Sequence, residues 1–141
     1  MARVEIPLPD TFLFETALDI RVGDINYGGH MGNDAILTLA QEARIRFLRQ
    51  SGYTEMDVDG VGIIMADAAI RYIAEARHGD RLRFRIGIGD LSRCGLELIY
   101  QATDDRTGKE VARLKTGIVF FDYGHRKVVP IPESFAARFC R

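Results

Sequence analysis

Cysteine and histidine are scarce in this chain. Only two of its 141 residues are cysteines, Cys94 and Cys140, and only three are histidines. Two thiols cannot form a framework of several disulfides, and neither belongs to a CxxC pair or to another spacing typical of a metal site. His30, His78 and His125 are scattered without ligand spacing. We therefore expect two reduced thiols, a cytoplasmic location and no metal centre.

The chain also lacks an excess of one charge and any long apolar run. Its formal net charge is −1, which gives no bulk attraction to nucleic acid or to an anionic membrane. No segment approaches the length of a membrane span, and the N-terminal MARVEIPLPD has no apolar core of signal-peptide length. With 47% hydrophobic residues, residues 1–141 are expected to form a single domain without nucleic-acid or membrane partners.

What the chain does contain is a loop rich in glycine, histidine and asparagine, GDINYGGHMGND at residues 23–34. It lies between a strand pattern and a helix pattern. Glycines allow tight bends and close approach of other atoms, and the helix that follows offers unpaired backbone N–H groups. Such a place can hold a polarised carbonyl oxygen or a phosphate. The loop is therefore predicted to be a functional site rather than a connector.

The pattern on either side of the loop changes from strand to helix. Residues 12–22 alternate between apolar and polar positions, as a strand does. From about residue 33 to residue 50 the apolar residues fall on one helical stripe that consists of Ile36, Leu39, Ala40, Ala43 and Phe47. Asn33 is the expected N-cap, and Ser51–Gly52 is expected to end the helix. Other apolar residues spread around the helix, so we expect a sheet to wrap it.

The rest of the chain is predicted to be mostly strands. Residues 61–73 are nearly continuously apolar, which is typical of a strand covered on both sides. Further strands are expected at 81–90, 94–103 and 111–122, with a turn at 104–110 in which Gly108 adopts a left-handed conformation. ESFAARF near the C-terminus is a possible helix. Short turns between successive strands predict an α+β fold, a curled antiparallel sheet around one long central helix.

Three segments resemble a known family. The family pattern D-x-D-x-x-G-H-V-N-N corresponds to DINYGGHMGN at 24–33, and the helix ending E-E-A-R corresponds to QEAR at 41–44. A third pattern, I-x-Y-x-x-P-A-R-x-G-D, is similar to IRYIAEARHGD at 70–80. Over roughly residues 11–125, the chain resembles hotdog-fold thioesterases of the 4-hydroxybenzoyl-CoA thioesterase-like branch.

This resemblance implies an assembly and a chemistry. It implies a homodimer or homotetramer with active sites at the subunit interface. The substrate would be a small-molecule acyl thioester of coenzyme A, or one of acyl carrier protein, and no separate cofactor would be needed. A backbone N–H at the start of the helix would polarise the thioester carbonyl, and a carboxylate would attack it or activate a water.

The resemblance also assigns roles to residues of the loop and helix. The backbone N–H of Asn33 would form the oxyanion site. Asn26 stands where a catalytic Asp is common; as an amide it can orient water or substrate, or simply satisfy loop backbone groups. Gln41 replaces the acid of the helix and could also position substrate. His30 is either a general base or, as more often in the family, a structural bridge between the loop and a neighbouring chain.

Two carboxylates are expected as the general base, Asp34 and Asp67. Asp34 is close to the oxyanion position but could merely serve the helix dipole. Asp67 interrupts an apolar run, where burying an acid is costly, so a buried carboxylate acting across a dimer is one interpretation and an edge hydrogen bond is the other. Asp24 is expected to brace the loop, and Glu42 to pair with Arg46.

Four residues are expected to bind substrate: Gly29, His30, Arg77 and Arg93. The two arginines suit the phosphates of coenzyme A, although surface arginines are commonly just solvated. The sequence therefore predicts an acyl-CoA thioesterase that uses water as the nucleophile. A non-catalytic acyl-CoA binding or regulatory protein is the alternative, since amides occupy two usual acid positions. A hydratase is less consistent, because the glycine- and proline-rich signature of those enzymes is absent.

Overall fold

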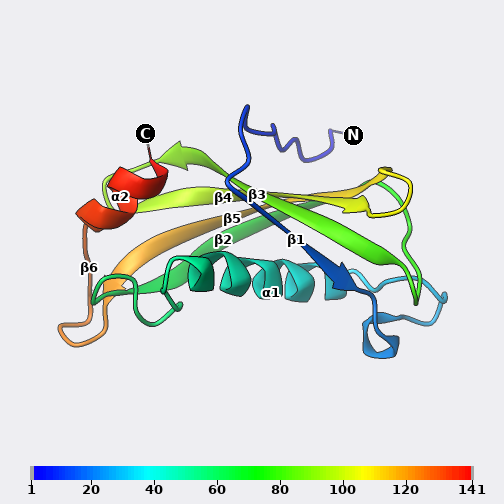
Figure 1. Ribbon diagram of the computed structural model, residues 1–141, viewed down its shortest axis with the longest axis horizontal. Helices are drawn as coiled ribbons and strands as arrows, with labels where there is room; N and C mark the ends of the chain where they lie inside the picture. Colours follow the sequence, from blue (N-terminus) through cyan, green and yellow to red (C-terminus); the bar gives the residue numbers. More distant parts are fainter. Residues whose placement is uncertain (1, 141) are drawn as a thin grey trace.

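The chain forms a curved antiparallel sheet with one long helix on its concave side (Figure 1). The computed structural model describes residues 2–140, so Met1 and Arg141, the ends of the expected domain, lie outside the described residues. The strands are β1 (Phe14–Asp19), β2 (Gly62–Tyr72), β3 (Arg81–Leu91), β4 (Gly95–Asp104), β5 (Glu110–Asp122) and β6 (Lys127–Val128). The helices are α1 (Ala35–Gln50) and α2 (Glu133–Phe139), and a 3-10 turn, η1, spans Val22–Asp24.

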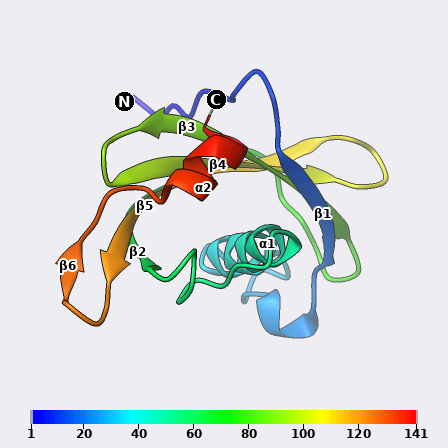
Figure 2. The ribbon, with the colours of Figure 1, turned by 60° about the vertical axis from the view of Figure 1, so that its left-hand side comes forward.

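The sheet order is β1-β3-β4-β5-β2, and β6 pairs with β5. Every pairing is antiparallel, as the short turns predicted. Figure 2 shows the sheet curving around α1, which is the α+β hotdog arrangement expected from the sequence. Gly108 has a φ of +77°, which confirms the predicted left-handed turn between β4 and β5. Neither helix within residues 2–140 is long and apolar enough to cross a membrane.

The predicted apolar stripe of α1 forms the centre of the core. Ile36, Leu39, Ala40, Ala43 and Phe47 are all buried, as expected. The curled sheet wraps the helix as expected, and Figure 2 shows one side of α1 that the sheet does not cover. The opposite side of α1 from the stripe carries exposed polar residues at 38, 41, 42 and 46.

The start of α1 differs from the prediction by two residues. The helix begins at Ala35, and the cap position is held by Asp34 in a helical conformation, without a side-chain capping bond. Asn33 is not the N-cap because its carbonyl accepts a hydrogen bond from the Tyr72 hydroxyl at 2.8 Å, which holds this residue in the preceding turn. The predicted end is confirmed, since the helix stops at Ser51 and Gly52.

The strand predicted to be covered on both sides is an edge strand. β2 pairs with β5 alone, and its central residues, Met65 to Ala68, are exposed. A continuous apolar run is typical of a buried strand, but an edge strand of small residues that can pair with a second strand has the same pattern. The bulge between Met65 and Asp67 falls in this exposed stretch.

One buried arginine links the helix to the sheet. Arg44, from the QEAR segment, donates to the Tyr100 hydroxyl at 3.0 Å and to Glu55 at 3.3 Å. Tyr100 also bonds Thr116 at 2.7 Å, and both are fully buried. Burial raises the pKa of Tyr100, so its hydroxyl stays neutral. This network pairs the polar groups that lie beneath α1, as buried polar groups require.

Candidate active site

The glycine-rich loop is anchored at its first acidic residue, as predicted. Asp24 is buried, and its carboxylate accepts the Arg21 backbone N–H at 2.9 Å. Its own carbonyl accepts the Gly32 N–H at 2.8 Å, so one residue joins both ends of the loop. Asp24 therefore braces the loop, and its carboxylate is occupied there.

Asn26 shapes the tip of the loop. Its side-chain Oδ1 accepts the Gly28 N–H at 2.9 Å, and its backbone N–H donates to the His30 carbonyl at 2.9 Å. The turn passes through Gly29, whose φ of +79° is accessible to few other residues. The loop role considered for Asn26 is thus present in the structure. Its side-chain Nδ2 donates to no group within residues 2–140.

The segment that follows β2 forms the facing wall. The Met31 N–H donates to the Ala76 carbonyl at 2.7 Å, and the Tyr72 hydroxyl donates to the Asn33 carbonyl at 2.8 Å. The N–H groups of Ile73 and Ala74 both donate to the Val111 carbonyl. Two walls far apart in the sequence are therefore joined to each other and to β5.

A cavity of about 310 Å³ lies between these walls. The loop contributes Asn26, His30, Met31 and Asn33, and the rest of the lining comes from residues 72–76 and from Val111 and Ala112 of β5. The backbone N–H of Asn33 donates to no group within the described residues. A backbone donor next to the start of a helix is suited to a carbonyl oxygen that gains negative charge.

The hydroxyl of Tyr72 is held in its neutral form. Burial and then the negative charge of Asp34 raise the pKa of Tyr72 above that of a free tyrosine. The neutral hydroxyl is the form that donates to the Asn33 carbonyl. The hydrogen bond between Tyr72 and Asn33 therefore persists into alkaline solution.

This pKa shift gives a pH-dependent prediction. The favourable contribution of the Tyr72 hydroxyl is complete below ~10, the pKa of a free tyrosine, and is lost as the pH rises through its raised pKa. A phenolate absorbance titration of the wild type minus that of Tyr72→Phe should show one tyrosine ionising later than a free tyrosine. A difference spectrum with its transition at the ordinary tyrosine pKa would contradict the prediction.

A carboxylate that the sequence reasoning missed lines this cavity. Glu75 Oε2 lies 3.3 Å from His30 Nε2 and 3.7 Å from an Arg77 guanidinium nitrogen. His30 therefore links the loop to the segment after β2 of the same chain, whereas the bridge to a neighbouring chain stays a prediction. The sequence did contain a signal for Glu75, because this acid replaces the proline of the family pattern I-x-Y-x-x-P-A-R.

Several predicted site residues lie outside the cavity. Asp67 has a 62% exposed side chain that pairs with Lys115 at 3.4 Å and accepts the Gly117 N–H. Of the two interpretations of Asp67, the single chain has the edge hydrogen bond and not the buried carboxylate, because β2 lies at the edge of the sheet. Arg93 follows the far end of β3, an 11-residue strand that spans about 35 Å. Asp34 lies at the start of α1, outside the cavity lining.

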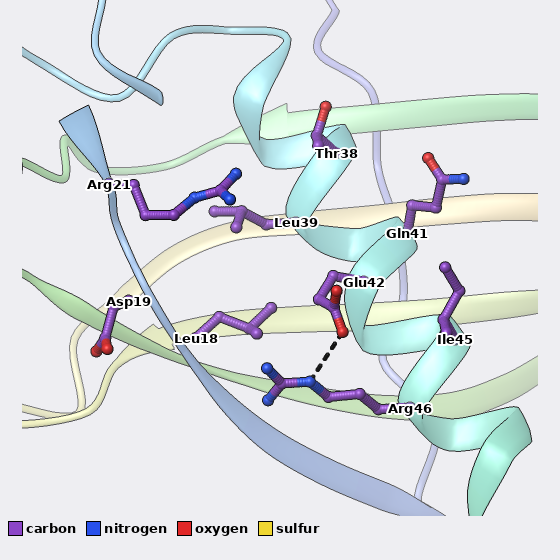
Figure 3. A pocket seen from close by; sticks show the side chains of 9 residues that line it. All are labelled: Leu18, Asp19, Arg21, Thr38, Leu39, Gln41, Glu42, Ile45 and Arg46. Atoms are coloured by element: carbon purple, nitrogen blue, oxygen red, sulfur yellow. Dashed lines mark hydrogen bonds and ion pairs between the residues drawn. The ribbon is translucent and has the colours of Figure 1, made fainter. Parts of the chain in front are cut away.

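Gln41 lines a separate cavity of about 420 Å³ between β1 and the exposed side of α1 (Figure 3). In this cavity Glu42 and Arg46 form the predicted ion pair at 2.9 Å. Arg46 also donates to the Ala17 carbonyl of β1, which fixes the helix against the strand. Gln41 and Asn26 are therefore in different cavities of the single chain.

Within residues 2–140, no group of three or more His, Cys, Asp or Glu side chains is arranged to hold a metal ion. The chemistry available at the loop is that of backbone donors, amides, a histidine and a carboxylate.

Comparison with known families identifies the class of protein. The model of the thioesterase-like superfamily matches residues 20–139, which include both walls of the cavity. The chain belongs to the thioesterase-like superfamily. It is a thioester hydrolase of the hotdog fold, as the motifs around residues 24–33 and 70–80 implied.

Solved structures share the fold of this superfamily member at low sequence identity. A 1,4-dihydroxy-2-naphthoyl-CoA thioesterase from Synechocystis aligns with a TM-score of 0.81 and 22% identity, over 90% of this chain and 95% of its own. A gentisyl-coenzyme A thioesterase aligns at 0.76 and 20%, over 86% and 98%. A hypothetical protein from Staphylococcus aureus, in complex with CoA, aligns at 0.80 and 17%, over 95% and 85%. No curated protein matches the chain significantly in sequence.

Proposed function

We propose that this protein hydrolyses a coenzyme A thioester by attack of water in the cavity between the loop and residues 72–76. The observation that carries the proposal is the Asn33 N–H, which donates to no group within residues 2–140 and belongs to a residue that lines this cavity, in a chain of the thioesterase-like superfamily. Hydrolysis requires only water and the thioester, so no separate cofactor is invoked.

In the proposed step the thioester carbonyl oxygen accepts the Asn33 N–H. Charge grows on this oxygen as water adds, so a fixed donor stabilises the transition state more than the substrate. Asn26 lines the same cavity, and its side-chain Nδ2 would orient the water or the thioester. Gln41 lies in the other cavity, so the step uses Asn26 alone of the two amides.

The water must lose a proton to a base. Of the two carboxylates predicted from the sequence, Asp34 is the nearer, because its charge reaches the Tyr72 hydroxyl in the cavity wall. Asp67 is tied to Lys115 and Gly117 on the edge of the sheet. Its edge position fits an interface role better than a catalytic one.

We further propose that the protein works as a homodimer joined along β2, with a homotetramer as a possible further assembly. An exposed edge of small apolar residues is a ready template for a second strand. β2 has 11 residues and an exposed centre, whereas β1 is shorter and carries charged Glu15 and Asp19. Since Tyr72–Ala76 continue β2, a second copy would lie beside the cavity.

The ligand is proposed to be a coenzyme A thioester with a compact acyl group. One structural relative was determined with CoA, and two are thioesterases of aromatic acyl-CoA substrates. A cavity of about 310 Å³ suits a group of that size. Arg77 pairs with Glu75 of the cavity lining and is proposed to bind phosphate, whereas Arg93 is at the far end of β3. The two free thiols suit a cytoplasmic location.

The decisive experiment is hydrolysis of a panel of short, long and aromatic acyl-CoA thioesters, with the released thiol detected and binding measured in parallel. Asn26→Ala should lower kcat/KM by about 10–100-fold, the effect of one lost hydrogen bond of ~1.5–3 kcal/mol to a charged group. Tyr27→Ala is the matched control, because this loop side chain is fully exposed. Equal rates in Asn26→Ala and the control would remove Asn26 from the mechanism.

The alternative function is binding of acyl-CoA without turnover. It is favoured by one observation, that the Asn26 Oδ1 is occupied by loop N–H groups and no acid stands at either usual position. Tight binding with no thiol release from any thioester in the panel would establish this alternative and overturn the proposed hydrolysis.

A further inference from the structure

We propose that Glu75 is the carboxylate that activates the water and that His30 positions it. This inference rests on the proposed thioester hydrolysis. It assigns the base to the segment after β2, and neither the loop nor the helix supplies it.

The carboxylate of Glu75 is held from one side. His30 Nε2 and the Arg77 guanidinium both lie against Oε2, at 3.3 and 3.7 Å. Within residues 2–140, Oε1 accepts no hydrogen bond. Oε2 therefore lies against two nitrogen groups, and Oε1 is available to accept a proton from water.

The backbone around Glu75 is fixed as well. The preceding Ala74 N–H donates to the Val111 carbonyl at 3.1 Å, and the following Ala76 carbonyl accepts the Met31 N–H at 2.7 Å. These bonds tie the residue to β5 on one side and to the glycine-rich loop on the other. A general base needs such a fixed position, because proton transfer requires the base within hydrogen-bond reach.

Glu75 also lies in the cavity where the thioester is proposed to bind. It lines the same cavity as Asn26 and Asn33, whose backbone N–H is the proposed oxyanion donor. A water between Glu75 and a thioester carbonyl held by Asn33 would have a base on one side and an electrophile on the other. His30, in the same lining, has its Nε2 3.3 Å from the carboxylate and would orient it by donating an N–H.

The other carboxylates near the loop contact other groups or lie outside the cavity lining. Asp24 is buried against the Arg21 N–H, and Asp67 pairs with Lys115 on the sheet edge. Glu42 pairs with Arg46 in the other cavity. Asp34 is outside the cavity lining. Glu75 is the carboxylate of the described residues that lines this cavity.

The step balances as a simple hydrolysis. Glu75 takes a proton from water as the water oxygen bonds to the carbonyl carbon, and the Asn33 N–H stabilises the resulting oxyanion. The oxyanion then re-forms the carbonyl, the carbon–sulfur bond breaks, and the sulfur leaves with its electron pair. Protonated Glu75 returns the proton to sulfur. The products are the carboxylic acid and the free thiol of coenzyme A.

The test compares Glu75→Gln and Glu75→Ala with wild type on the best acyl-CoA of the panel. General-base catalysis contributes ~10²–10⁴-fold, so kcat should fall by about that factor in both variants while KM changes little. Formate should partly restore the activity of Glu75→Ala, because it supplies a carboxylate to the vacated space. Glu133→Gln, an exposed acid on α2, is the control for loss of charge.

The role of His30 has its own variants. The amide Nε2 of a glutamine can donate to Glu75 from nearly the same place, so His30→Gln should keep most of the activity that His30→Ala loses. Equal losses in these two variants would overturn the positioning role of His30.

Failures of the two proposals are distinguishable. A wild type that turns over no thioester overturns the proposed function. A wild type that turns over, together with an unchanged rate in Glu75→Gln, overturns only the assignment of Glu75. Loss of activity in a folded Glu75→Ala that formate does not restore also overturns the base role, because it indicates a structural one. Circular dichroism and thermal unfolding of each variant verify the fold.

Discussion

The double substitution Ala66→Lys and Ala68→Lys should convert the proposed β2 dimer to monomers and remove most of the thioester hydrolysis. Both positions are in the exposed centre of β2. A β-strand can pair along its edge only if side chains there tolerate a close neighbour, and edge lysines are a natural means of blocking such pairing. In a symmetric interface each lysine would also face like charges from the second copy, which adds repulsion.

The measurement is molar mass by light scattering at several protein concentrations, with hydrolysis measured on the same samples. Leu91→Lys is the matched control, since Leu91 is 50% exposed on β3 and lies away from the β2 edge. It should leave the molar mass and the rate unchanged. A double variant that stays dimeric would refute the β2 interface, and a monomer with full activity would show that the cavity is complete in one chain.

Phe47→Ala should lower the free energy of unfolding by about 3–5 kcal/mol, the usual cost of deleting a buried aromatic ring. Phe47 is 1% exposed on α1. Its ring centroid lies 5.7 Å from that of Phe14 on β1 and 5.0 Å from that of Phe139 on α2. The substitution thus weakens both the contact of the helix with the edge of the sheet and its contact with the C-terminal helix.

Denaturant unfolding at one fixed protein concentration measures this effect, because a dimer gains apparent stability with concentration. Leu37→Ala is the control on the same helix, where the side chain is 38% exposed; a surface substitution should change stability by only ~0.5 kcal/mol. Similar losses in the two variants would mean that the aromatic cluster is not the centre of the core.

Periodicity explains why much of the fold could be predicted. The stripe from Ile36 to Phe47 repeats as a helix does, and Leu82, Phe84 and Ile86 alternate as a half-buried strand does, so each pattern identifies its own element. Burial of these residues in the structure confirms both patterns. The resemblance of residues 24–33 and 70–80 to one family added the topology, which periodicity alone does not specify.

The parts that could not be predicted depend on which segments meet. Asp67 reads as buried because its neighbours are apolar, yet it lies on a sheet edge, which is a property of the strand order. Glu75 is 45 residues from His30 in the chain, and the spacing in the sequence does not show that their side chains meet. The N-cap was misplaced for the same reason, since Tyr72 holds Asn33 from another strand.

The strand order also determines when each part can fold during synthesis. β1 pairs with β3 through residues such as Asp19 and Arg81, which are 62 positions apart. At ~5–20 residues per second on the ribosome, Asp19 of β1 is made roughly 3–12 s before Arg81 of β3, and the end of α1 at Gln50 roughly 1.5–6 s before it. β2 waits for β5 over a somewhat shorter separation, since Gly62 and Phe121 are 59 positions apart. The nascent chain must therefore keep an amphipathic helix uncovered, and this interval is when chaperone binding would protect it.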